Sequence, residues 1–264
     1  MQQTEDVSLL IAGFPILLRF FPIRDYVYEK KLFKKNILKY LQGFRSTEPL
    51  DKHTTINIID REKYQIVFNR KTSFAELAFY KNAHTIEIQY QVSIAQFLMT
   101  LSNLITALLH QNSGLVLHAS ACIIDRKAHV FIGQSGAGKS TIVRMLRKKY
   151  HILADDLLYL KKIKKDYVAY QTANIEKVRW ISKTNESYPL GGIYLLRQAT
   201  RTRIDTLDTQ IAFQKILSNT MFIPKQKASI INTLFNLTST NPRTYLLHFN
   251  LDQQSVIHTL EQGT

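Results

Sequence analysis

Nine consecutive residues combine three glycines, a lysine and hydroxyl side chains at a spacing typical of phosphate binding. They are Gly133, Gln134, Ser135, Gly136, Ala137, Gly138, Lys139, Ser140 and Thr141, and they satisfy the pattern G-x-x-x-x-G-K-[ST]. Glycines let backbone amides curl around phosphate oxygens, and the next helix points its positive end at them. We expect Lys139 to reach the β- and γ-phosphates of ATP and the Ser140 hydroxyl to bind Mg²⁺.

Two adjacent carboxylates, Asp155 and Asp156, follow the short apolar run at residues 152–154. Open α/β sheets place their ligands at the carboxyl ends of their strands, so we expect this pair to lie near the bound phosphates. One carboxylate suits the acceptance of a hydroxyl proton and the other suits Mg²⁺, which favours phosphoryl transfer to a hydroxyl. A solvated acidic turn is the alternative interpretation. His118 lies on the approach to the loop, but a lone histidine at a strand end is more often structural than catalytic.

The elements that position these residues follow from the apolar pattern. An apolar strand at residues 128–132 leads into the loop, and an amphipathic helix with apolar positions from Ile142 to Tyr150 follows it, which is the context that a P-loop needs. Other strands are predicted at 54–59, 64–68, 85–90, 115–118, 120–124, 152–154, 192–196 and 244–249, helices at 92–110 and 209–218, and turns at 125–127 and 161–166.

Composition limits the classes of protein that this chain can be. Its 264 residues carry a formal net charge of +15, which attracts nucleotides, acidic proteins, nucleic acid and anionic lipid without choosing among them. The single cysteine, Cys122, excludes an internal disulfide, a Cys-rich zinc site and a CxxC redox pair. The N-terminus lacks the basic region of a signal peptide, and polar residues interrupt the apolar run at 92–110, so we expect a cytoplasmic protein with no membrane span.

The pattern of elements changes along the chain. The first part is mostly β until about residue 93, and the strand-loop-helix-strand unit comes later. The sequence therefore predicts an α/β protein in which residues 1–110 form an N-terminal α+β region, a candidate for acceptor recognition, and residues 111–264 form the P-loop catalytic domain. The boundary is drawn from the change in pattern alone.

Three segments in order, Leu117-His118-Ala119-Ser120, the glycine-rich loop and Ala154-Asp155-Asp156, resemble the catalytic domain of the HPr kinase/phosphorylase family. Its shorter kinase-like relatives are more similar still, over roughly residues 110 to 220. The resemblance implies a nucleotide-binding core like that of HPr kinase and phosphoenolpyruvate carboxykinase. It also implies that Asp155 activates the acceptor hydroxyl, that Asp156 is its metal-side partner, and that His118 lies beside the catalytic aspartate.

The chain also departs from that family. Thr141 stands where HPr kinases have an acidic residue, and no glycine-rich phosphorolysis signature follows the aspartates. Similarity to short relatives from peptide-modification systems implies an ATP-dependent kinase for a serine of a peptide or protein. Alternatives are a kinase for a small-molecule hydroxyl and a nucleotide-dependent binding module without catalysis. The lysine run at 161–165 predicts an acidic acceptor, no nucleic-acid-binding motif is found, and a homo-oligomer is left open.

Overall fold

The structure is a computed structural model that describes residues 4–23, 28–47, 53–60, 65–69, 72–76, 78–82, 84–176, 178, 180–240 and 243–263. The chain forms two compact units, an N-terminal unit of Met1–Leu104 with Lys183–Asn185 and a C-terminal unit of Ile105–Ser182 with Glu186–Thr264. The division falls inside helix α2 (Ile94–Gln111), which also contains residue 110.

A five-stranded mixed sheet with strand order β1-β2-β3-β7-β6 forms the core of the N-terminal unit. Its strands are β1 (Glu5–Ile11), β2 (Phe14–Phe20), β3 (Thr54–Ile59), β6 (Ala78–Asn82) and β7 (Thr85–Gln89). Strands β4 (Gln65–Asn69) and β5 (Thr72–Glu76) form a separate pair, and the helices are α1 (Tyr28–Tyr40), η1 (Gln42–Phe44) and the first part of α2. Alternate residues such as Leu9, Ile11, Ile16 and Leu18 are fully buried, as expected of strands with one face on a core.

The C-terminal unit is built on a nine-stranded sheet with strand order β11-β9-β10-β14-β13-β12-β8, to which β16 and β15 are added beside β14. Its strands are β8 (Gly114–His118), β9 (Ser120–Ile124), β10 (Lys127–Ile132), β11 (His151–Ala154), β12 (Leu157–Ile163), β13 (Asp166–Gln171), β14 (Ser187–Gln198), β15 (Arg203–Thr206) and β16 (Thr244–Phe249). Its helices are the end of α2, α3 (Lys139–Leu146), α4 (Thr209–Leu217), η2 (Pro224–Gln226), α5 (Lys227–Thr240) and α6 (Gln253–Gln262).

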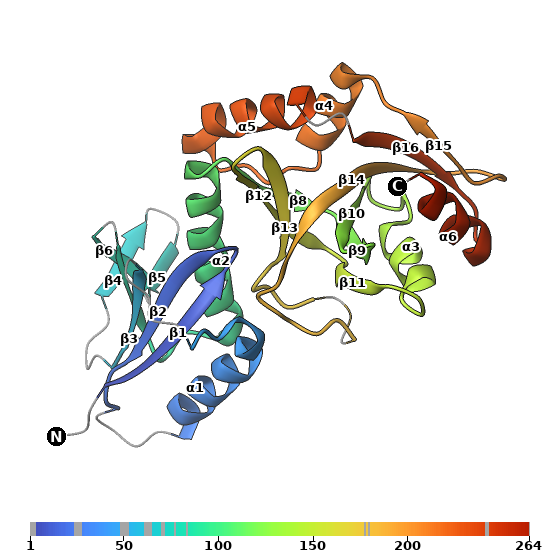
Figure 1. Cartoon of the computed structure of the whole chain (residues 1–264). Helices are drawn as coiled ribbons and strands as arrows, with labels where there is room; N and C mark the ends of the chain where they lie inside the picture. Colours follow the sequence, from blue (N-terminus) through green and yellow to red (C-terminus); the bar gives the residue numbers. More distant parts are fainter. Residues whose placement is uncertain are drawn as a thin grey trace. The chain divides into compact units, whose positions relative to one another are not determined.

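Helices cover both faces of this sheet (Figure 1). Successive residues of a strand point to opposite faces, so Val130 joins a buried cluster with α4 and α5 while Phe131 joins another with α3 and α6. The protein is therefore α/β with mixed sheets and a smaller, mostly β N-terminal part. Among the described helices, none is long and apolar enough to cross a membrane.

The strand directions bring several strand ends to one edge of the sheet. Strand β10 runs parallel to β14, and β11 and β10 are both antiparallel to β9, so β10 and β11 end at the same edge. At the same end of the strands, Ala119 connects β8 to β9, and Asp155 and Asp156 connect β11 to β12. The amide of Ala119 donates to the carbonyl oxygen of Asp156 at 3.1 Å, so the two ends of the strand order meet there.

Several predicted elements differ from the observed ones. The predicted turn at residues 161–166 is shorter, because Lys161 and Lys162 belong to β12 and only Lys164 and Lys165 form the turn to β13. The helix after the glycine-rich loop ends at Leu146 instead of Tyr150. Helices α1, α5 and α6 and the hairpin of β1 and β2 were not predicted. That hairpin turns at Ala12 and Gly13 with positive φ values, although an Ala-Gly pair is a weak turn signal.

Candidate functional site

Residues 133–138 connect β10 to α3, and two of their glycines adopt backbone conformations that other residues adopt only with strain. Gly136 and Gly138 adopt φ values of +82° and +104°, in the left-handed region that favours glycine. A Cβ atom on Gly138 would lie 2.5 Å from the Phe249 ring, so the loop can approach β16 this closely only without a side chain. The strand, loop and helix follow one another as the sequence predicted.

Lys139 begins α3 and turns its side chain back into the loop. Its Nζ atom donates hydrogen bonds to the carbonyl oxygens of Gly133 at 2.7 Å and Gln134 at 3.3 Å, and the residue is only 9% exposed. The rest of the loop is open to a ligand: Gln134, Ser135, Gly136 and Thr141 are exposed, and Ala137, Gly138 and Ser140 are half-buried. An exposed run of backbone at a helix start with an inward lysine fits the phosphates of a nucleotide.

Asp155 is held by hydrogen bonds at the end of β11. It is only 2% exposed, and its Oδ1 atom accepts a hydrogen bond from the Ser120 hydroxyl at 3.1 Å. Its backbone amide donates to a Glu176 carboxylate oxygen at 3.3 Å. The hydrogen bond from the Ser120 hydroxyl fixes the orientation of the Asp155 carboxylate. Its burial leaves little of the carboxylate in contact with solvent.

Asp156 and His118 form a more exposed pair. His118 Nδ1 lies 3.5 Å from Asp156 Oδ1, and their side chains are 43% and 28% exposed. His118 is the last residue of β8, and it faces Leu157, the first residue of β12, across the strand pair. The structure thus brings the His118 ring beside the carboxylate of Asp156.

Asn219 links the histidine to the glycine-rich loop. Its backbone carbonyl accepts a hydrogen bond from the amide of His118 at 2.7 Å, and its side-chain oxygen receives a long one from the amide of Gly133 at 3.4 Å. Its side-chain nitrogen donates to the carbonyl of Lys215 at 2.8 Å, which fixes the orientation of the amide. Asn219 is 8% exposed and lies just after α4, so it joins elements that are far apart in the sequence.

The loop and the carboxylates lie at neighbouring positions along one edge. Strands β10 and β11 are separated only by β9, which puts their ends about 10 Å apart at the usual spacing of strands. A polyphosphate chain can span such a gap. Sequence reasoning missed Asn219 and Glu176, and it left Ser120 without a role although Ser120 ends the Leu117–Ser120 run. No local pattern marks Asn219 or Glu176.

Among the described residues, no group of three or more His, Cys, Asp and Glu side chains is placed to hold a metal ion. Ser140 and Asp156, the predicted Mg²⁺ ligands, are both half-buried and lie at the same edge of the sheet. That set fits Mg²⁺, which is usually held by one or two protein oxygens together with substrate phosphates and water.

The lysine run does not lie beside these residues. Leu157 of β12 pairs with His118, whereas Lys161 pairs with Gly114 at the other end of β8. The turn at Lys164 and Lys165 therefore lies about 20 Å along the strand from the aspartates. The expectation that this run lies beside the aspartates is therefore not met, because β12 carries it to the opposite end of the strands.

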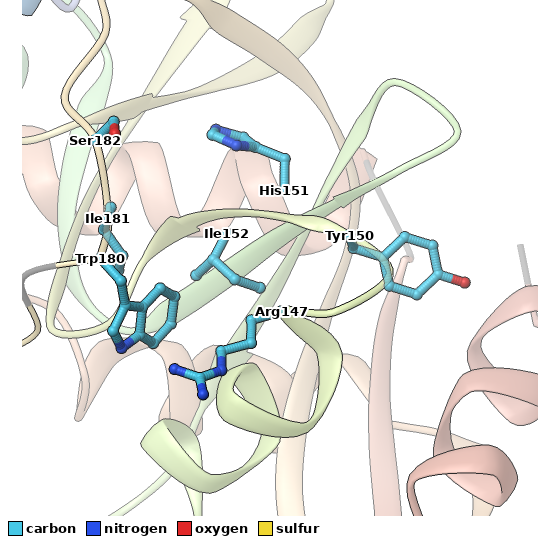
Figure 2. Close-up of a pocket in the computed structure, with 7 residues that line it drawn as sticks. All are labelled: Arg147, Tyr150, His151, Ile152, Trp180, Ile181 and Ser182. Atoms are coloured by element: carbon cyan, nitrogen blue, oxygen red, sulfur yellow. The ribbon is translucent and has the colours of Figure 1, made fainter.

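A pocket of about 210 Å³ lies beside the start of β11 (Figure 2). Arg147, just after α3, lies with its guanidinium 5.3 Å from the centroid of the Trp180 ring. His151, the first residue of β11, lines the same pocket, so the whole strand separates it from Asp155. The lining residues are Arg147, Tyr150, His151, Ile152, Trp180, Ile181 and Ser182.

The sequence and the structure were compared with those of known proteins. No curated protein matches the sequence. A solved structure described as "Structure of the Hpr(Ser) kinase/phosphatase from Coxiella burnetii" is similar at 12% sequence identity and a TM-score of 0.32, over 56% of this chain and 99% of that chain. A family model described as "SynChlorMet cassette protein ScmC" matches residues 84–236, which is more than half of the chain and includes every candidate site residue. The chain therefore belongs to the ScmC family.

Proposed function

We propose that this protein is an ATP-dependent kinase that transfers a phosphoryl group to a serine hydroxyl of a peptide or protein. One observation carries the proposal: the loop that contains Lys139 and the group formed by Asp155, Asp156 and His118 meet at one edge of one sheet. Phosphoryl transfer needs little else from a protein, because positioning and charge neutralisation account for most of the catalysis.

The residues take distinct roles in this proposal. The γ-phosphoryl group passes from bound ATP to the serine oxygen and ADP leaves, and a bound Mg²⁺ would offset the negative charge of the phosphates. Lys139 exchanges its contacts to the loop carbonyls for phosphate oxygens, and the amides of residues 133–141 surround them. Ser140 and Asp156 offer oxygens to the metal ion.

A carboxylate at the end of β11 takes the proton of the acceptor hydroxyl. We assign this role to Asp155, with Ser120 holding its oxygen in place. Its burial is consistent with a base that the acceptor reaches through a closely fitting site. Asp156 is more exposed than Asp155, and the adjacent His118 is placed to orient its carboxylate. The roles of the two aspartates are therefore tested with separate variants.

Two features support a peptide or protein as the acceptor. The net charge of +15 favours an acidic partner over a neutral metabolite. The family description names a cassette protein, so peptides encoded beside its gene are the first acceptors to test. The N-terminal unit, which is not needed to build the loop or the aspartate pair, is available for recognition of such an acceptor.

Mass spectrometry after incubation with labelled ATP tests the proposal directly. We expect a neighbouring-gene peptide to gain one phosphate on serine in a reaction that needs Mg²⁺. Phosphate found only on a small hydroxyl compound would favour the small-molecule kinase. Tight ATP binding without transfer to any acceptor would favour the non-catalytic binding module.

A further inference from the structure

Two large apolar side chains are exposed beside the candidate site. Met221 is 47% exposed and Phe222 is 41% exposed, and both lie in the short connection between α4 and η2. Single exposed apolar residues are ordinary on a protein surface. These two are adjacent in sequence and are separated by one residue, Thr220, from Asn219, which contacts both His118 and the glycine-rich loop.

Backbone hydrogen bonds fix the path of this connection. Asn219 accepts from the amide of His118, Thr220 forms an antiparallel bridge with Leu117, and the amide of Met221 donates to the carbonyl of Val116 at 2.8 Å. Residues 219–221 therefore run along the outer side of β8, away from His118. Met221 lies opposite Val116, which is two residues from His118 in β8. At about 3.3 Å per residue, this separation is about 7 Å along the strand.

Basic side chains flank the apolar pair. Lys215 lies in α4 on one side of the connection, and Lys225 and Lys227 follow it in η2 and at the start of α5. All three residues are exposed. An apolar surface between exposed lysines complements a partner that carries both an apolar side chain and acidic residues.

We infer that Met221 and Phe222 form a docking surface for the acceptor peptide, which we call the 221–222 surface. This inference rests on the proposed kinase function. Its occupant is an extended acidic segment whose serine reaches the aspartate pair and whose apolar side chain covers Met221 and Phe222. The spacing along β8 sets that apolar side chain about two to three residues from the serine.

Peptide binding tests the surface without relying on catalysis. The probes are two labelled synthetic peptides, each with one serine among glutamates, and one of them carries a leucine two residues from the serine. We expect the full-length protein to bind the leucine peptide about tenfold more tightly than the leucine-free peptide, as burial of an apolar side chain predicts. Fluorescence anisotropy measures both dissociation constants.

Substitutions then locate the effect. In the double variant Met221→Ser with Phe222→Ser, the preference for leucine should fall to less than about twofold. Phe235→Ser is the matched control, because Phe235 is 62% exposed in α5, and this variant should keep the full preference. Thermal unfolding of each variant shows that the fold is retained.

The outcomes separate this inference from the kinase function. Equal binding of the two peptides, or a leucine preference that survives the double substitution, overturns the docking surface. Transfer of phosphate to both peptides, together with equal dissociation constants, would leave the kinase and remove the surface. A leucine preference that depends on Met221 and Phe222, without any transfer from ATP, would keep the surface and remove the kinase.

Discussion

The backbone amide of His118 donates a hydrogen bond to the carbonyl oxygen of Asn219 at 2.7 Å. His118 is the last residue of β8 and Asn219 lies in the segment after α4. Their contact therefore joins two segments of the candidate site that are far apart in the sequence. The Asn219 side chain also accepts a long hydrogen bond from the amide of Gly133, so one residue contacts both the histidine and the glycine-rich loop.

Removal of the Asn219 side chain tests this link. We expect Asn219→Ala to lower the free energy of unfolding by about 1 to 2 kcal/mol, because the amide makes hydrogen bonds in a buried position. We also expect phosphoryl transfer to fall about ten- to hundredfold, because the amide of Gly133 in the glycine-rich loop loses its side-chain partner while the backbone contact to His118 remains. Urea unfolding and single-turnover kinetics measure the two effects. Asn232→Ala in α5, at an exposed position, is the control. A loss of stability with normal transfer would make Asn219 purely structural.

Lys139 should decide nucleotide affinity. In Lys139→Ala we expect ATP binding to weaken by roughly 1.5 to 3 kcal/mol, the usual contribution of a charge-assisted hydrogen bond, with a larger effect on turnover. Calorimetry with ATP and Mg²⁺ measures the affinity. Lys148→Ala, at an exposed position just beyond α3, should bind ATP normally. Equal affinities of wild type and Lys139→Ala would contradict the assignment of the loop.

The two aspartates should lose different functions when each becomes asparagine. Asp155→Asn should retain ATP and lose transfer by about 10² to 10⁴-fold, because an amide cannot accept the hydroxyl proton. Asp156→Asn should raise the Mg²⁺ concentration needed for activity. A Mg²⁺ titration of turnover separates these effects, with the exposed Asp166→Asn as the control. The opposite pattern, in which Asp156→Asn alone stays inactive at saturating Mg²⁺, would exchange the two roles.

The lysine run at the far end of β12 should not contribute to acceptor binding. Lys164→Gln with Lys165→Gln should leave the acceptor KM within about twofold at low and moderate salt, because screening removes charge effects beyond about 10 Å. Kinetics against ionic strength check this expectation. A KM that rises several-fold in the variant would show that the acceptor extends along β12 to the other edge of the sheet.

His129 should make the fold sensitive to acid. Burial lowers its pKa to about 4, with Lys127 acting in the same direction and Asp125 against it. The unfolded histidine titrates near 6.5, so between those values the unfolded state binds a proton that the folded state does not, and stability falls as pH falls. We expect a loss of about 2 kcal/mol between pH 7 and pH 5 from this residue.

The variant His129→Gln isolates that contribution. It should lack this part of the pH dependence, whatever its stability at pH 7. Urea unfolding at both pH values measures the difference. The buried His110, whose pKa is also lowered by burial, remains in both proteins and serves as the common background. Parallel pH curves for the two proteins would show that His129 titrates normally in the folded state.

Local sequence patterns predict the parts of the site that are contiguous in the chain. The structure of residues 128–146 could be predicted from local sequence. An apolar strand, glycines at left-handed positions and an amphipathic helix each depend only on neighbouring residues. The strand that ends before Asp155 could be predicted for the same reason, as could most of α2 and α4. Residue types and their order also indicated a phosphate-binding chemistry.

The residues that complete the site from distant parts of the chain are brought there by strand pairing and helix packing. Strand pairing between β8 and β12 brings His118 beside Asp156, the crossing between β8 and β9 brings Ser120 to Asp155, and the end of α4 delivers Asn219. The same pairing carries Lys164 and Lys165 away, although they are close to Asp156 in sequence. Strand register and direction are set by the packing of whole faces against the helices, and no local pattern encodes them.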